Sequence, residues 1–209
     1  MAKNLDAKCK QCRRVGEKLM LKGERCNTPK CAMVKRNYPP GIHGTKGRNR
    51  STGYGLQLME KQKARKTYNM LEKQFRLTFE KSKKMQGNIG ENFLQLLEMR
   101  LDNAIYRMNL APSRSKARQI INHGHITVND RKVSIPSYTV KKGDIIKIKA
   151  SSLRSKLFTD LKEKIKTLEA PGWIHFDKGE LTGKILHAPS VQDITTNINI
   201  STVVEFYSR

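Results

Sequence analysis

The apolar positions of the chain follow a helical period over much of its length. Leu71, Phe75 and Phe79 are each four residues apart. Because this spacing puts apolar side chains on one face of a helix, we expect helices within 56–85. Two further stretches share the period. Their apolar residues are Phe93, Leu94, Leu97, Leu101, Ile105 and Met108 in the first, and Leu157, Leu161, Ile165 and Leu168 in the second. They predict helices over 93–108 and 153–168.

Proline, serine and glycine mark the ends of the central helices. Pro112 ends the helix over 93–108, Ser113 caps the next one, and Gly124 stops it. Arg114 and Arg118 are four residues apart, so we expect them to project together from the polar face of that second helix.

Alternating apolar and polar residues follow Gly124. They predict short strands over 125–128, 131–135, 138–140 and 145–149, with Asn129-Asp130 as the first turn. The segment from Pro171 onward also reads as strand. Helices together with a small antiparallel sheet place the chain in the α+β class, with an irregular N-terminus over 1–55.

The charge of the chain predicts its kind of partner. Of 209 residues, 42 are Lys or Arg and 18 are Asp or Glu, a net charge of +24, so we expect a polyanion as the counterpart. No run of about eighteen apolar residues is present, and residues 1–10 lack the apolar core of a secretion signal. We therefore expect no membrane partner and a reducing, cytoplasmic location.

Two groups of basic residues stand out. Lys46, Arg48 and Arg50 alternate along a glycine-rich loop, which is either a flexible linker or a loop that becomes ordered on phosphates. The second group is a predicted helical cluster, either a solvated face or a phosphate-binding face. Its members are Lys61, Lys63, Arg65 and Lys66.

All the cysteines lie near the N-terminus. Cys9 and Cys12 are three residues apart, and Cys26 and Cys31 follow after thirteen intervening residues. Four thiolates at this spacing match one structural Zn²⁺ with every position filled, which leaves no open site for catalysis. A redox Cys-x-x-Cys and buried cysteines without a metal are the alternatives. Neighbouring Arg13 and Arg14 would offset the thiolate charge and contact the polyanion.

Two other patterns resemble catalytic or metal sites. His123 and His125 flank Gly124, but no third ligand is near, so packing or a hydrogen bond to a sugar or phosphate is favoured over a metal. The triplet Arg100-Leu101-Asp102 resembles one in pseudouridine synthases, where the aspartate is catalytic. Here Asp102 falls inside a predicted amphipathic helix, which favours an ion pair.

Several longer blocks resemble the bacterial-type family of small-subunit ribosomal protein S4. The most specific is GENFLQLLEMRLDNAIYRMNLAPSRSKARQIINHGHITVN, and GERCNTPKCAMVKRNYPPGIHG, YGLQLMEKQKARKTY, EKQFRLTFE and VVEFYSR also match. The resemblance spans nearly the whole chain except 150–190. One departure is Asn129-Asp130, where the family shows Asn-Gly.

The resemblance implies both the domain organisation and the function. A helical first domain with a zinc-bound N-terminal segment would comprise 1–91, an inserted RNA-binding module 92–150, and a C-terminal part packing with the first domain 151–209. The family binds the 5′ domain of small-subunit rRNA, nucleates assembly, contacts ribosomal protein S5 and influences translational accuracy along the mRNA route. Some members repress their own mRNA.

The family pattern also assigns residues. Zinc would be held by Cys9, Cys12, Cys26 and Cys31. RNA contacts would be made by Lys35, Arg36, His43, Lys61, Lys63, Arg65, Lys66, Arg107, Arg114, Lys116, Arg118, His123 and His125. The expected protein is a non-enzymatic, ribosome-bound chain that does not form homo-oligomers; an organelle ribosome would carry the same pattern. An RNA-modifying enzyme and a stand-alone RNA-binding factor with this module are the alternatives.

Overall fold

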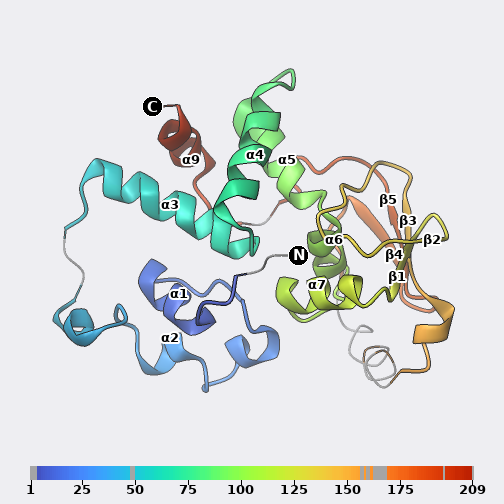
Figure 1. Ribbon diagram of the computed structural model, residues 1–209, viewed down its shortest axis with the longest axis horizontal. Coiled ribbons are helices and arrows are strands. Elements are labelled where there is room, and N and C mark those ends of the chain that lie inside the picture. Colours follow the sequence, from blue (N-terminus) through green and yellow to red (C-terminus); the bar gives the residue numbers. More distant parts are fainter. Residues whose placement is uncertain are drawn as a thin grey trace. The chain divides into compact units, whose positions relative to one another are not determined.

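The chain divides into two compact units. The computed structural model describes residues 4–47, 50–155, 158, 161, 169–194 and 196–208 (Figure 1). One unit comprises Met1–Phe93 with Thr196–Arg209, and the other comprises Leu94–Thr195. The expectation that the whole of 151–209 packs with the N-terminal part is therefore wrong for the stretch up to Thr195.

The N-terminal segment of the first unit consists of short helices around a small core. These are α1 (Lys8–Val15), η1 (Gly23–Asn27), α2 (Ala32–Lys35) and η2 (Ile42–Lys46). Helix α1 ends at Gly16, whose φ of 91° is the left-handed conformation that glycine adopts without strain. The core of the segment is formed by Cys12, Val15, Leu19, Leu21, Cys31 and Met33.

The rest of the first unit is helical, and its last helix comes from the C-terminal segment. Helix α3 (Gly53–Thr67) lies beside α9 (Ile200–Tyr207), as Figure 1 shows. From α4 (Glu72–Lys83), Phe79 stacks on Tyr207 with ring centroids 4.7 Å apart. Residues 200–207 therefore form a helix and not the strand that their β-branched and aromatic residues suggested.

The helices of the second unit differ from the single long helix expected over 93–108. Helix α5 (Ile89–Glu98) starts in the first unit and ends at Glu98. A separate helix, α6 (Leu101–Arg107), starts after Arg100. The first backbone N–H groups of α6 donate to a loop: Leu101 N lies 2.8 Å from the carbonyl oxygen of Tyr138. Arg100 pairs with Thr139 in an isolated bridge. This pairing accounts for the break and for the absence of a longer strand at 138–140.

Helix α7 (Arg114–Asn122) and the turn after it form as expected. The Ser113 hydroxyl accepts a hydrogen bond from Lys116 N at 3.3 Å, and Gly124 has a φ of 73° just beyond the helix. Among the described residues, no helix is long and apolar enough to cross a membrane.

Five antiparallel strands form the sheet of the second unit. They are β1 (Ile126–Val128), β2 (Arg131–Lys132), β3 (Ile145–Ile148), β4 (Ile174–Asp177) and β5 (Thr182–Ile185), in the spatial order β2-β1-β3-β5-β4. The short helix η3 (Ala150–Ser152) follows β3. Asn129 and Asp130 make the β1–β2 turn with positive φ of 50° and 61°. The α+β class is confirmed, and most of the helix expected over 153–168 lies outside the described residues.

One face of the sheet packs against the helices. Ile126, Ile146 and Ile185 are fully buried there with Leu101, Ile105 and other apolar residues of α6 and α7. Trp173, the only tryptophan of the chain, is fully buried in the same core. Its fluorescence therefore reports on the folding of the second unit.

Gly183 fixes how closely β5 approaches α6. A Cβ at this position would collide with the sulfur of Met108. We expect Gly183→Ala to lower the free energy of unfolding by about 1–3 kcal/mol through overpacking, measured by urea unfolding followed at Trp173. Gly172→Ala is the control, because its Cβ would meet only Asp193 Oδ1 at 3.9 Å. Equal midpoints for the two variants would contradict this packing.

Candidate nucleic-acid interface and cysteine cluster

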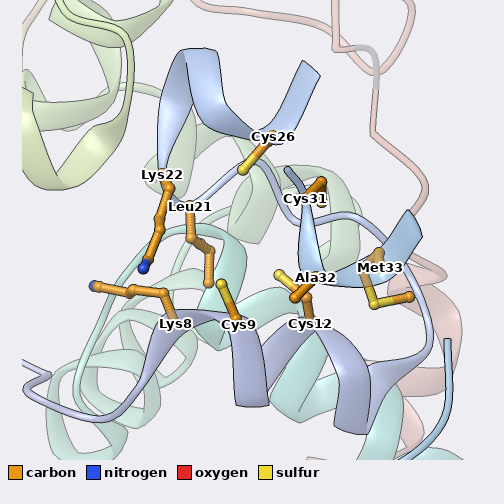
Figure 2. A pocket seen from close by; sticks show the side chains of 9 residues that line it. All are labelled: Lys8, Cys9, Cys12, Leu21, Lys22, Cys26, Cys31, Ala32 and Met33. Atoms are coloured by element: carbon orange, nitrogen blue, oxygen red, sulfur yellow. The ribbon is translucent and has the colours of Figure 1, made fainter. Parts of the chain in front are cut away.

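All the cysteines line one small cavity in the N-terminal segment. Cys9 and Cys12 rise from one turn of α1, and Cys26 and Cys31 come from η1 and the start of α2 (Figure 2). The cavity measures about 20 Å³, enough for a single ion or water molecule. None of the cysteines is in a disulfide. The Cys-x-x-Cys spacing thus places Cys9 and Cys12 on one helical turn beside the other two cysteines, and the metal itself stays a prediction.

The surroundings of the cavity suit a cation bound by sulfur. Burial raises the pKa of the Cys12 thiol, a backbone hydrogen bond involving Leu19 lowers it, and the three other cysteines raise it further. A bound cation would reverse these last contributions, because it favours thiolates. Lys8 and Lys22 also line the cavity, and no carboxylate does. Within the described ranges, no three Cys, His, Asp or Glu side chains form a preassembled metal site.

The basic cluster of α3 is largely engaged inside the protein. Lys61 is buried and its ammonium lies 2.7 Å from Glu72 Oε1, while Lys63 is buried 2.9 Å from Glu17 Oε1. Arg65 lies 3.4 Å from the other oxygen of Glu72. These three side chains stabilise the packing around α3, so the geometry does not favour them as RNA contacts.

Arg13 also makes internal contacts. Its guanidinium donates to the carbonyl oxygens of Tyr38 at 2.9 Å and Pro39 at 3.2 Å, and it stacks over the Tyr38 ring at 4.7 Å. Arg13 therefore ties α1 to the Tyr38-Pro39 loop.

Two fully buried carboxylates bind arginines where α5, α6 and α7 meet. Glu98 accepts two hydrogen bonds from Arg107, at 2.7 and 2.9 Å, and one from Asn103 at 2.7 Å. Asp102 lies 2.8 Å from Arg100 and 3.4 Å from Arg118. Asp102 thus has the structural ion pair expected of it, and its carboxylate is 1% exposed.

The expectation that Arg114 and Arg118 project from the helix is wrong. Both are 8% exposed. Arg114 donates to Asn103 Oδ1 at 2.8 Å and stacks 4.4 Å above the Tyr106 ring. Their four-residue spacing does place them on one face of α7, but that face packs on α6 instead of facing solvent.

The other predicted RNA contacts lie at the surface. Lys66, Lys116 and His125 are half-buried, and Arg48 lies outside the described residues. The exposed members are Arg14, Lys35, Arg36, His43, Lys46, Arg50 and His123.

Lys66 belongs to a group of like charges at the ends of α1 and α3. Burial lowers the pKa of its ammonium, and the neighbouring cations Arg65 and Arg14 lower it further, against smaller opposing contributions from Asp6 and Cys12. Bringing cations together in this way is unfavourable unless an anion binds among them.

A second group surrounds the turn after α7. The rings of His123 and His125 are 6.0 Å apart, and His125 Nδ1 lies 2.9 Å from the Ser152 hydroxyl. Lys132 and Lys149 were missed as members of this group. The β1–β2 pairing Thr127↔Lys132 brings Lys132 back toward Gly124. The turn predicted at Asn129-Asp130 could have revealed the position of Lys132, because the turn fixes the register of the hairpin.

Arg114 gives a direct test of the buried network. Arg114→Met would leave Asn103 Oδ1 without this donor, so we expect the second unit to lose about 1–3 kcal/mol of unfolding free energy. The matched control is Lys116→Met on the same helix, with an expected change within about 0.5 kcal/mol. Urea unfolding followed at Trp173 measures both; an Arg114 variant as stable as the Lys116 variant would contradict the network.

Comparison with known proteins assigns the chain to a family. Residues 3–98 match the model of the ribosomal protein S4/S9 N-terminal domain, and residues 99–146 match the S4 domain. Three relatives span the whole of both chains. They are the small ribosomal subunit protein uS4A of Alkaliphilus metalliredigens (51% identical) and the small ribosomal subunit proteins uS4 of Halothermothrix orenii (50%) and Clostridioides difficile (49%).

These relatives confirm the sequence-based assignment and the expectation of a non-enzymatic ribosomal protein. They exclude the alternative of an RNA-modifying enzyme. With two family models side by side over 3–146 and relatives matching from end to end, the chain belongs to the ribosomal protein S4 family.

Proposed function

We propose that this chain is a structural constituent of the small ribosomal subunit that binds the 5′ domain of its rRNA directly. One observation carries the proposal: the buried lysines of α3 are paired with carboxylates, whereas other basic residues of each unit gather among like charges near its surface. Lys61 and Lys63 represent the first kind, and Lys66 with Arg14 represents the second. Phosphates are the anions that would complete the surface groups.

The N-terminal unit supplies one part of the proposed interface. Arg14 and Arg65 lie close enough to Lys66 for their charges to lower the pKa of its ammonium. Exposed Lys35 and Arg36 follow at the end of α2. Because Arg13 and the ion pairs of α3 hold the underlying helices, these cations are presented on a preformed surface, which suits shape recognition of folded RNA.

The second unit supplies another part around the His123–His125 turn. Lys116, Lys132 and Lys149 surround it, on α7, β2 and the residue after β3. The α7 arginines contribute by fixing the helix that carries Lys116 and His123. In this proposal Arg107, Arg114 and Arg118 position the interface and do not bind phosphate themselves.

Family membership supports the wider role. We propose that the protein nucleates assembly of the subunit, contacts ribosomal protein S5, and influences translational accuracy beside the mRNA route. It would act on ribosomes in the cytoplasm, and repression of its own mRNA would use the same RNA-binding surface.

We further propose one structural Zn²⁺ held by Cys9, Cys12, Cys26 and Cys31. The support is an all-sulfur donor set around one ion-sized cavity, lined by Lys8 and Lys22 and by no carboxylate. When bound, the metal would cross-link α1 to the segment that contains η1 and α2. It would hold the Arg13 and Arg14 turn in place and supply no reaction chemistry.

The RNA proposal predicts a steep dependence on salt. Affinity for 5′-domain rRNA should fall by about a hundredfold or more between 50 and 200 mM monovalent salt, because several phosphate contacts release counterions. Replacing Arg14 and Lys66 by Gln should reduce the slope of log K against log salt by about 2. Filter binding with the full chain measures both.

The control for this experiment carries the same change in charge. Lys178→Gln with Lys184→Gln alters exposed lysines of the β4–β5 hairpin that belong to neither proposed group, so its salt slope should equal that of the wild type. A salt-independent affinity would refute phosphate binding, and an unchanged slope in the Arg14 and Lys66 variant would remove that group from the interface.

The metal proposal predicts one zinc per chain by native mass spectrometry. Cys12→Ser or Cys31→Ser should abolish stoichiometric binding, because a structural site needs all its ligands. Chelation should speed amide hydrogen exchange in α1 and leave the urea unfolding of the second unit, followed at Trp173, unchanged. A metal-free mass with all thiols reduced would contradict the site.

A further inference from the structure

The turn after α7 holds two imidazoles in a defined arrangement. Its backbone is fixed, because Gly124 N donates to Ile121 O at 2.8 Å and His125 N donates to Ile120 O at 3.3 Å. The His125 ring lies edge-on to Phe158 at 5.8 Å, and its Nδ1 contacts the Ser152 hydroxyl at 2.9 Å. His123 is exposed, with its ring 6.0 Å away. The two rings are therefore placed side by side at the surface.

Cations from α7, β2 and the end of β3 surround His125, whereas η3 and Phe158 contribute uncharged contacts. Helix α7 brings Lys116 and His123, Lys132 of β2 lies against Gly124, and Lys149 follows β3. The Lys116 ammonium lies 3.4 Å from Gln119 Oε1, an uncharged group. Among the described residues, no carboxylate is found to act on His125. Within the part of the chain that the structure describes, the turn is therefore a concentration of positive charge without a carboxylate acting on His125.

This environment disfavours the protonated form of the His125 imidazole in the unbound protein. Burial lowers the pKa of His125, and the charges of His123, Lys116 and Lys149 lower it further. A phosphate group near the turn would act in the opposite direction, since an anion within a few ångströms favours the protonated ring. The Ser152 hydroxyl suits both states, because it can donate to a neutral Nδ1 and accept from a protonated one.

We propose that the His123–Gly124–His125 turn is a phosphate site for RNA whose occupation takes up a proton at the His125 imidazole. The inference rests on the proposed function, and it adds a regulatory property to the same surface. The proton comes from solvent and adds to a ring nitrogen, and no covalent bond to the RNA forms.

The direction of the effect follows from the two states of the protein. The pKa of His125 is lower in the unbound protein than in the complex, so the complex holds more protons between those two values. Affinity then increases as pH falls through the pKa of the complex, and it levels off below the pKa of the unbound protein. Above both values the imidazole is neutral in each state and affinity is constant.

The experiment measures affinity for 5′-domain rRNA from pH 8.0 to 5.5 at constant ionic strength, with the full chain. We expect affinity to rise about tenfold, which corresponds to a shift of about one pKa unit on binding. The double variant with His123→Asn and His125→Asn should lose this rise, so its affinity should be the same at pH 8.0 and at pH 5.5. Asparagine at 125 retains a nitrogen near the position of Nδ1 for the contact with Ser152.

Matched controls separate this turn from the other histidines. His43→Asn removes an imidazole of the proposed interface in the first unit, and His175→Asn removes one from β4; both should keep the full rise. Trp173 fluorescence is measured in parallel to check that the second unit stays folded over the pH range. Histidine NMR resonances followed with and without RNA should show the pKa of His125 increase in the complex.

Each outcome decides the inference. A rise in affinity that disappears only in the double variant supports it. A rise that persists in the double variant, or disappears in His43→Asn, overturns it. Salt-sensitive binding that is constant with pH also overturns it but leaves the proposed function standing, whereas absence of binding at every pH overturns both.

Discussion

The packing of the second unit depends on one constraint, the burial of the Glu98 and Asp102 carboxylates. A carboxylate can be fully buried only if cations and hydrogen-bond donors compensate its loss of water. Glu98 closes α5 and is held by Arg107 of α6, whereas Asp102 begins α6 and is held by Arg118 of α7. These requirements fix where three helices meet. The turn after α7 and the strands that follow it are positioned in consequence.

The same requirement divides the basic residues of the chain into buried and surface groups. A buried basic residue needs an acceptor from the protein itself, as Lys61 has Glu72 and Arg114 has the amide oxygen of Asn103. A basic residue at the surface has no such requirement, so the residues around Lys66 and around His125 can gather without carboxylates. The basic residues that give the chain its net charge of +24 thus have two different roles. Buried charged side chains determine how the helices pack, and basic side chains at the surface determine which kind of partner binds.

Local signals in the sequence predicted local structure well. Ser113 and Gly124 bound α7, and Asn129-Asp130 makes the hairpin turn, because each of these residues acts through its own backbone or its near neighbours. The proximity of the cysteines could also be predicted, since Cys9 and Cys12 fall on one helical turn. Family motifs added the wider assignment, which the comparisons confirmed.

Nonlocal contacts account for what could not be predicted. Lys63 pairs with Glu17, 46 positions earlier, and Arg118 pairs with Asp102, 16 positions earlier, so spacing alone made both basic residues look solvent-facing. The break at Arg100 comes from carbonyl groups of the 136–138 loop. In α9, packing against α3 and α4 overrides the strand preference of Val203, Val204 and Phe206.

The position of α9 in the chain has a consequence for synthesis. Phe75, Phe79 and Phe93 form an aromatic cluster that Tyr207 completes, yet Tyr207 follows all of the second unit in sequence. A ribosome making this protein therefore delivers the contiguous unit over 94–195 before the first unit can close. During that interval the aromatic face of α4 lacks its cover, and the nascent chain is open to chaperones or RNA at its N-terminal half.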